Sequence, residues 1–198
     1  MGNWEKDLSP IARQRLARIG EFTQEEKEKM LDSEKVTSLL SEFHQGQINP
    51  ETLWSRLKEE GKPSLLREAQ VRLVDSLNFG VPPADLQRKR EGILAIENLK
   101  KEQNTSVIEL NLNRMDELQK RYRAEIEQAY NGIRAEVEKN PRLRMKQVQQ
   151  GQNTMVVQLT IDEAIKQLPQ WQDFLSNQGK RYSQEFASTK EKLQRELK

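Results

Sequence analysis

The spacing of apolar residues predicts a series of short helices in the first part of the chain. Up to residue 80 these residues recur at intervals of three and four, which is the period of a helix with one buried face. Each helical segment follows a capping residue and stops at a glycine. The predicted helices begin at Ser9, Thr23, Asn49 and Ser64. We interpret residues 1–80 as a small N-terminal helical bundle.

The longest predicted helix covers residues 106–139. Ser106-Val107-Ile108-Glu109 has the pattern of a capping box, Asn140-Pro141 provides a stop, and no proline lies between them. Apolar positions along it advance by three or four residues, close to the heptad repeat of a coiled coil. We therefore expect this seam to form an interface between copies of the chain, since the N-terminal bundle is too short to cover all of it. In the competing interpretation, helices 83–102 and 180–197 fold back and cover the seam within one chain. The candidate interface residues are Ile108, Leu112, Met115, Tyr122, Ile126, Ala129, Ile133 and Val137.

The clearest linker is Gly80-Val81-Pro82-Pro83, because it combines residues that interrupt regular structure. It suggests two regions, the bundle of residues 1–80 and a second region of residues 83–198. The second region opens with a predicted helix from residue 83 to about 101. It also contains the long helix and everything that follows it.

The apolar period changes between Leu143 and Ile161. Apolar and polar residues alternate from 154 to 161, in a stretch rich in β-branched residues, and this predicts a strand. In one interpretation residues 143–149 pair with it across a turn at Gly151. In the other, Pro141 starts a further helix and only 154–160 is extended. An isolated hairpin is marginally stable, so it would need a helix or a second chain against it.

The C-terminal part returns to helical spacing. Thr160-Ile161-Asp162-Glu163 predicts a capping box and a helix that stops at Pro169. A brief aromatic helix around Trp171 should follow, and Gly179 should separate it from a last helix. The predicted fold class is mostly α, with one small β-hairpin or strand near residues 143–160.

Composition indicates a thin core and a large surface. The chain is 34% hydrophobic and 32% charged, against roughly 45–50% and 25% in an average domain. It has no cysteine, no apolar run long enough to span a bilayer and no signal-peptide pattern, so we expect a cytoplasmic protein. The net charge of +2 gives no general reason to bind nucleic acid, although residues 140–198 are more basic than the rest.

No pattern of residues predicts catalysis, a cofactor or a metal site. The single histidine, His44, follows Phe43 near a helix end, where a structural role is favoured over a catalytic one. One histidine and no cysteine cannot supply the usual zinc or di-iron ligands. Gly61-Lys62-Pro63-Ser64 lacks the upstream glycine of a phosphate loop, so we interpret it as a helix stop and a cap.

Two features leave nucleic-acid binding open. Helices 50–60 and 64–79 could form a helix-turn-helix, but Glu68 and Asp75 would then face phosphates, which favours a plain helical hairpin. On a strand, alternating cations would line one face and could contact phosphates or a protein partner. They could equally protect a sheet edge from aggregation. These candidate contacts are Arg142, Arg144 and Lys146.

The leading functional hypothesis is a non-enzymatic helical scaffold or adaptor that binds proteins and self-associates, with a dimer favoured. A nucleic-acid-associated factor using the basic segment 140–198 is the alternative, and an enzyme without a recognisable motif is the third. We further expect the segment 143–161 to carry recognition, because helical periodicity fails there. The competing interpretation is that this segment only connects helices.

Overall fold

The computed structural model describes residues 23–150 and 153–197, and this part of the chain is mostly helical, as predicted. The helix predicted to begin at Ser9 lies outside the described residues. A 3-10 turn, η2 (Pro141–Arg144), and two strands, β1 (Met145–Gln150) and β2 (Asn153–Gln158), interrupt the helices. The helices are α2 (Gln24–His44), α3 (Pro50–Glu60), α4 (Pro63–Asp75), α5 (Pro83–Glu97), α6 (Thr105–Lys139), α7 (Ile161–Gln167) and α8 (Pro169–Glu196).

Local capping explains some helix starts and not others. Thr23 and Thr160 form the predicted capping boxes, each with a glutamate three residues later, and Asn49 caps α3. The predicted caps at Ser64 and Ser106 are wrong. Helix α4 begins one residue before Ser64, and α6 begins one residue before Ser106, both without a side-chain cap. At α4 the proline already fixes a helical φ at the first position, so no cap is needed to start the turn.

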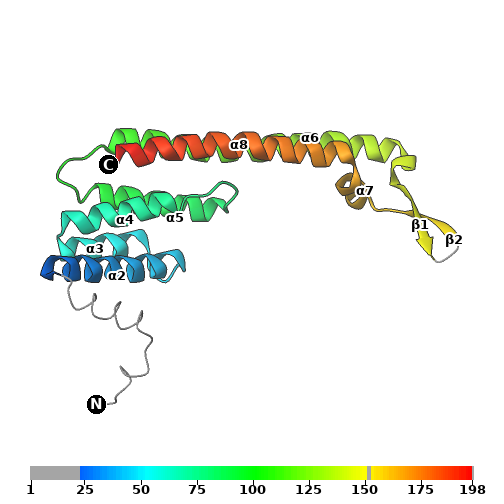
Figure 1. The fold of residues 1–198 in the computed structure, drawn as a ribbon. Helices are drawn as coiled ribbons and strands as arrows, with labels where there is room; N and C mark the ends of the chain where they lie inside the picture. The colour runs from blue at the N-terminus through cyan, green and yellow to red at the C-terminus, as the bar shows by residue number, and fades with distance from the viewer. Residues whose placement is uncertain (1–22, 151–152, 198) are drawn as a thin grey trace, which may run out of the picture.

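Helices α2 to α5 pack together at one end of the molecule (Figure 1), and we call them the head. Their core also takes in the first half of α6 and the C-terminal half of α8. It extends across the predicted linker at Gly80–Pro83, since Leu73 of α4 and Ile93 of α5 are both fully buried in it. The division into regions 1–80 and 83–198 stays a prediction.

Helices α6 and α8 lie side by side and extend well beyond the head (Figure 1). Helix α6 has 35 residues without a break, which confirms the predicted long helix and corresponds to roughly 52 Å. The predicted break at Gly179 is wrong, because α8 continues through it. A helical glycine costs only about 1 kcal/mol relative to alanine, and burial of Tyr182, Phe186 and Leu193 outweighs that cost.

The C-terminal end of α8 is fastened to the head by polar contacts. Lys190 Nζ donates to the carbonyl oxygens of Asp75 and Leu77, at 2.6 and 3.0 Å. Gln194 Nε2 donates to the Asp75 carboxylate at 2.6 Å. These carbonyls lie at the end of α4 and just beyond it, where a cation also complements the helix dipole.

The far end of the α6–α8 pair has its own small core, which we call the distal core. Val137, Ala164, Ile165 and Trp171 are buried there, and α7 lies against α6. Beyond it β1 and β2 form an antiparallel hairpin with Val148 opposite Met155, which confirms the hairpin interpretation. The helical alternative holds only for the four residues of η2.

Candidate interaction surface

The predicted seam on α6 is largely occupied within the chain. Ile108, Leu112 and Met115 belong to the head core, and Val137 belongs to the distal core. Between them Tyr122, Ile126, Ala129 and Ile133 are partly buried, and α8 packs along the same helix. Self-association stays a prediction, but the buried part of this seam does not offer a surface for it.

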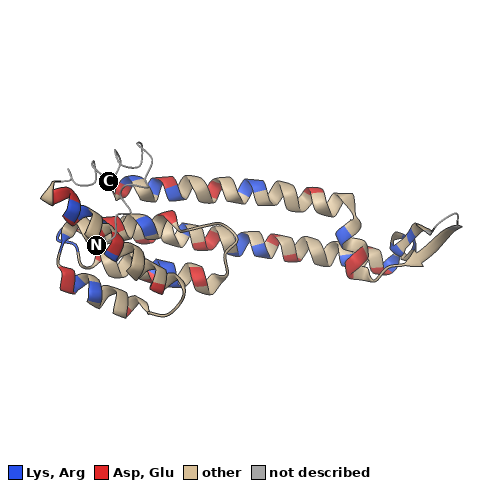
Figure 2. Ribbon diagram, turned by 60° about the horizontal axis from the view of Figure 1, so that its bottom comes forward, with Lys and Arg blue, Asp and Glu red and all other residues tan. Residues whose placement is uncertain are grey.

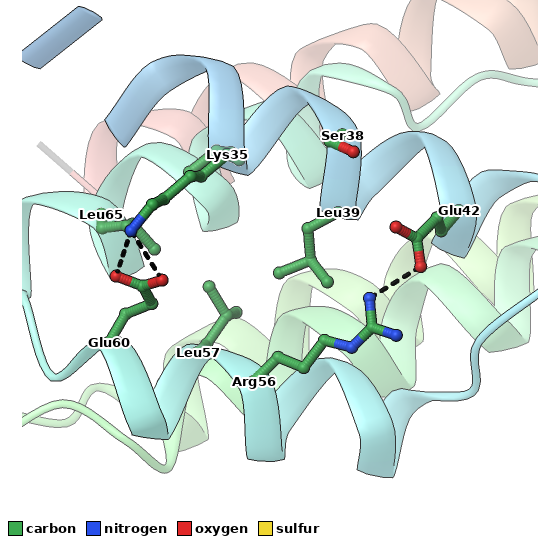
Figure 3. Close-up of a pocket in the computed structure, with 9 residues that line it drawn as sticks. Lys35, Ser38, Leu39, Glu42, Arg56, Leu57, Glu60 and Leu65 are labelled. Carbon is green, nitrogen blue, oxygen red and sulfur yellow. Dashed lines mark hydrogen bonds and ion pairs between the residues drawn. The ribbon is translucent and has the colours of Figure 1, made fainter. Parts of the chain in front are cut away.

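A shallow cavity of about 230 Å³ lies between α2 and α3 (Figure 3). Leu39, Leu57 and Leu65 line it, and it is smaller than the roughly 300–1,000 Å³ typical of ligand pockets. Its charged side chains are paired with one another: Lys35 Nζ lies 2.9 Å from Glu60, and Arg56 lies 2.7 Å from Glu42. Mutual neutralisation makes these pairs poor candidates for acid–base chemistry.

A second, more basic cavity of about 440 Å³ lies beside the end of α8. Three of its four cations, all but the exposed Lys101, have partners inside the protein. Lys58 lies over the Trp54 ring, Arg67 Nε donates to the Leu197 carbonyl, and Lys100 pairs with Glu97. The arrangement therefore explains how the C-terminal end of α8 is held, and it presents no evident set of groups for an anionic ligand.

His44 lies in the last turn of α2. Burial, together with the nearby cations Lys89 and Arg88, holds the pKa of His44 below its ordinary value. Arg88 donates to the His44 carbonyl, and the neighbouring ring is that of Phe43. These surroundings suit the structural role expected from the sequence.

The hairpin is where the structure leaves the most apolar surface uncovered. Met145, Val148, Met155, Val156 and Val157 are each 40–60% exposed, although they are large apolar residues. The hairpin projects past the ends of α6 and α8 (Figures 1 and 2). Contiguous exposed apolar surface of this kind commonly marks an interaction site.

The apolar residues occupy both faces of the hairpin. Residues opposite each other in an antiparallel pair share a face, and neighbours along a strand alternate between faces. Val148, Met155 and Val157 therefore lie on one face, and Met145 and Val156 lie on the other. Covering one face alone would leave the other exposed, so a flat contact with one helix cannot bury all five.

The base of the hairpin is firmly attached to the distal core. The Leu159 amide donates to the Arg144 carbonyl at 2.8 Å, and the Arg144 guanidinium donates to the Leu159 carbonyl at 2.9 Å. The Tyr130 hydroxyl donates to Asp162 at the start of α7, and the Tyr130 and Trp171 rings meet edge to face. The hairpin is thus held in place where it leaves the helices.

The predicted cationic row does not form. Arg142 and Arg144 lie in η2 and only Lys146 lies in a strand, so the three do not line one strand face. The expectation was wrong because Asn140 and Pro141 start a helical turn before the strand begins. Arg142 and Lys146 remain exposed, while Arg144 is engaged at the hairpin base.

The sequence signal for this surface was the local concentration of β-branched residues, whereas the candidate interface residues were placed on the long helix. The alternation of 154–161 identified β2 correctly, but it could not show that both faces would be left open. That exposure depends on where the helices end, which is a property of the whole fold.

None of the described helices has both the length and the apolar character required to cross a membrane. No curated protein and no solved structure matches the chain. Residues 51–195 match a protein family whose description is "Family of unknown function (DUF6657)". The matched range runs from α3 to the last turn of α8 and includes the helical pair, the distal core and the hairpin. Because this match covers well over half of its length, the chain belongs to that family.

Proposed function

We propose that this protein is a non-enzymatic helical scaffold or adaptor that acts through protein–protein contacts made by its hairpin. The observation that carries the proposal is the exposure of apolar side chains on both hairpin faces, beyond the ends of α6 and α8. A two-stranded hairpin is marginally stable without a further strand or a helix on it. A binding partner would supply that missing cover.

The rest of the molecule suits such a role. The α6–α8 pair acts as a spacer between the head and the hairpin, with roughly 50 Å of helix. Packing in the head core and in the distal core fastens the spacer at both ends. A stiff spacer places its contact surface at a defined distance, which lowers the entropic cost of binding.

The test is a pull-down from the native host, analysed by mass spectrometry. The bait is compared with a variant that carries Val156→Ser and Val157→Ser. A matched control carries Met30→Ser and Leu31→Ser, which alter two exposed apolar residues of the head instead. We expect the hairpin variant to lose partners that the control retains. Equal recovery with both variants would overturn the proposal that the hairpin carries recognition.

The nucleic-acid alternative retains one supporting observation, since residues 140–161 contain three cations and no Asp or Glu. It predicts binding to mixed DNA and RNA that weakens steeply with salt. Replacing Arg142 and Lys146 with Ala should then reduce the salt slope. A flat or absent salt dependence would leave the protein-binding function as the better explanation.

A further inference from the structure

The outer edge of β2 has the properties of a strand that pairs with another strand. Proteins protect exposed edges with charges, prolines or bulges. Strand β1 carries Lys146, whereas β2 carries no charged residue and no proline, and its ladder with β1 is regular. Of the two edges, β2 is therefore the one without protection.

The hydrogen-bond pattern shows which backbone groups this edge presents. The Leu159 amide donates to Arg144 across the strands, which makes Arg144 and Leu159 a hydrogen-bonded pair. Such pairs alternate along an antiparallel ladder, so Val156, three positions from Leu159, belongs to a pair that is not hydrogen-bonded. Its amide and carbonyl point away from β1 and are available to another strand.

From this edge we propose that β2 pairs antiparallel with β2 of a second copy of the chain, about a two-fold axis at Val156, to form a four-stranded sheet. The inference rests on the proposed function and specifies the occupant of its hairpin. A four-stranded sheet also meets the requirement for three or more strands that a lone hairpin lacks.

This register places apolar residues opposite apolar residues and polar residues opposite polar residues. Val156 lies opposite Val156 of the second copy on one face. On the other face Met155 lies opposite Val157 of the second copy, so Val148, Met155 and Val157 from the two chains form one continuous apolar stripe. The polar residues Thr154 and Gln158 lie opposite each other. If the register of the two β2 strands shifted by one residue, the outward amide and carbonyl groups of one strand would lie opposite residues whose own groups point toward β1. These groups would then have no hydrogen-bond partners.

Charge favours the antiparallel arrangement over a parallel one. Arg142, Arg144 and Lys146 lie at or near the base of the hairpin, and no Asp or Glu occurs from residue 140 to 161. In the antiparallel pair the two bases lie at opposite ends of the sheet. Six residues of strand add roughly 20 Å along the strands to the separation of the two bases. A parallel pair would place both bases at the same end of the sheet, separated only by three strand spacings, roughly 14 Å, so the antiparallel arrangement keeps the cations farther apart.

The absence of cysteine from the chain allows a clean cross-linking test. Val156→Cys should form a disulfide-linked dimer under mild oxidation, because a hydrogen-bonded antiparallel pair has a Cα separation of about 5.5 Å. Gln147→Cys is the matched control, since Gln147 lies directly opposite Val156 on the same face and is also exposed. In the proposed sheet the two copies of Gln147 lie roughly 14 Å apart, three strand spacings, and should not link.

Mass measurement by light scattering completes the experiment. The wild-type protein should approach twice 23.2 kDa as concentration rises through the micromolar range. Val156→Lys should return it to the monomer mass with an unchanged circular dichroism spectrum, and Gln147→Lys should not. A wild-type monomer, equal cross-linking of both cysteine variants or a dimer that survives Val156→Lys would each overturn the proposal. If the wild-type protein is a monomer and the hairpin variant still loses pull-down partners, the dimer proposal fails but the proposed function stands.

Discussion

Gly92 shows how one residue can fix the approach of two helices. It is buried in α5, and a Cβ built there would lie 2.8 Å from Cζ of Phe43 and 3.3 Å from a methyl carbon of Leu53. Both neighbours are fully buried, so neither can move freely. Glycine therefore permits close contact of α5 with α2 and α3, although it weakens the helix.

We predict that Gly92→Ala destabilises the protein by about 1–2 kcal/mol, since overpacking costs more than the gain in helix propensity. Gly132→Ala in α6 is the control, because a Cβ there meets nothing within 4 Å. That change should stabilise the protein by about 0.5–1 kcal/mol. Urea denaturation measures both, and a stabilising Gly92→Ala would contradict the packing argument.

Glu97 organises the turn between α5 and α6. Its carboxylate is almost completely buried and accepts hydrogen bonds from the Gln70 amide group, the Asn104 backbone and Lys100. Burial raises the pKa of Glu97, but these three donors outweigh burial and bring the pKa below its ordinary value. Ionised Glu97 therefore stabilises the fold.

A lowered pKa in the folded state means that this stabilisation is present at neutral pH and is lost as the pH falls through the acidic range. We predict that Glu97→Gln lowers the free energy of unfolding at pH 7 by about 1–3 kcal/mol, and that its stability changes less than that of the wild type on acidification. Glu109→Gln, at an exposed position of α6, is the control. Denaturation curves across the acidic range provide the measurement, and parallel pH profiles for wild type and Glu97→Gln would refute the role.

Sequence alone could not identify Glu97, because Gln70 lies 27 positions away and only the packed fold brings the two together. The capping boxes at Thr23 and Thr160 were predictable because all their atoms lie within four residues. The predicted cap at Ser106 is wrong for the same reason that Glu97 was missed. Just before α6, the Asn104 amide donates to the carboxylate of Glu97 from α5, and not to a local cap.

At the scale of elements, α6 and α8 depend on each other along their length. Phe79, Tyr122, Tyr182 and Phe186 form an aromatic cluster where the pair leaves the head, with ring centroids 5.0 Å apart for Phe79 and Tyr122. The Tyr182 hydroxyl donates to Glu125 at 2.6 Å. The seam was predictable from the apolar spacing of α6, and residues 180–197 were among the segments that could cover it within the chain. The full length of α8 was not predictable, since Gly179 suggested a break in that helix.

Because the cluster joins elements of one chain, Tyr122→Glu should destabilise the monomer and not merely separate two copies. We expect a loss of about 2 kcal/mol or more, from burying a charge without a partner and removing aromatic contacts. Leu110→Glu, at a position 68% exposed on the same helix, should change stability by less than about 0.5 kcal/mol. Thermal unfolding at several protein concentrations tests this. Unchanged unfolding of Tyr122→Glu would show that α8 does not depend on the cluster.

At the scale of the whole molecule, stability is distributed unequally between two cores. The head core gathers buried side chains from α2, α3, α4, α5, α6 and α8. The distal core has four buried residues, and beyond it the hairpin has none among the side chains that the structure describes. Local opening requires less free energy where fewer apolar contacts are broken. The continuous helices α6 and α8 link the two cores, but they do not make the two cores equally stable.

We therefore predict a gradient of amide hydrogen exchange along α6. Amides of its first part, around Leu112 and Met115, should exchange most slowly, because they open only when the head core unfolds. Amides near Val137 should exchange faster, because opening of the distal core alone exposes them. Amides of the hairpin should exchange fastest when measured at a low protein concentration, at which the proposed dimer dissociates. Ile165→Ala should accelerate exchange in α7 and the end of α6 and leave the head unchanged, since Ile165 is fully buried in the distal core only. Uniform protection along α6, or acceleration that spreads into the head, would show that the molecule unfolds as one cooperative unit.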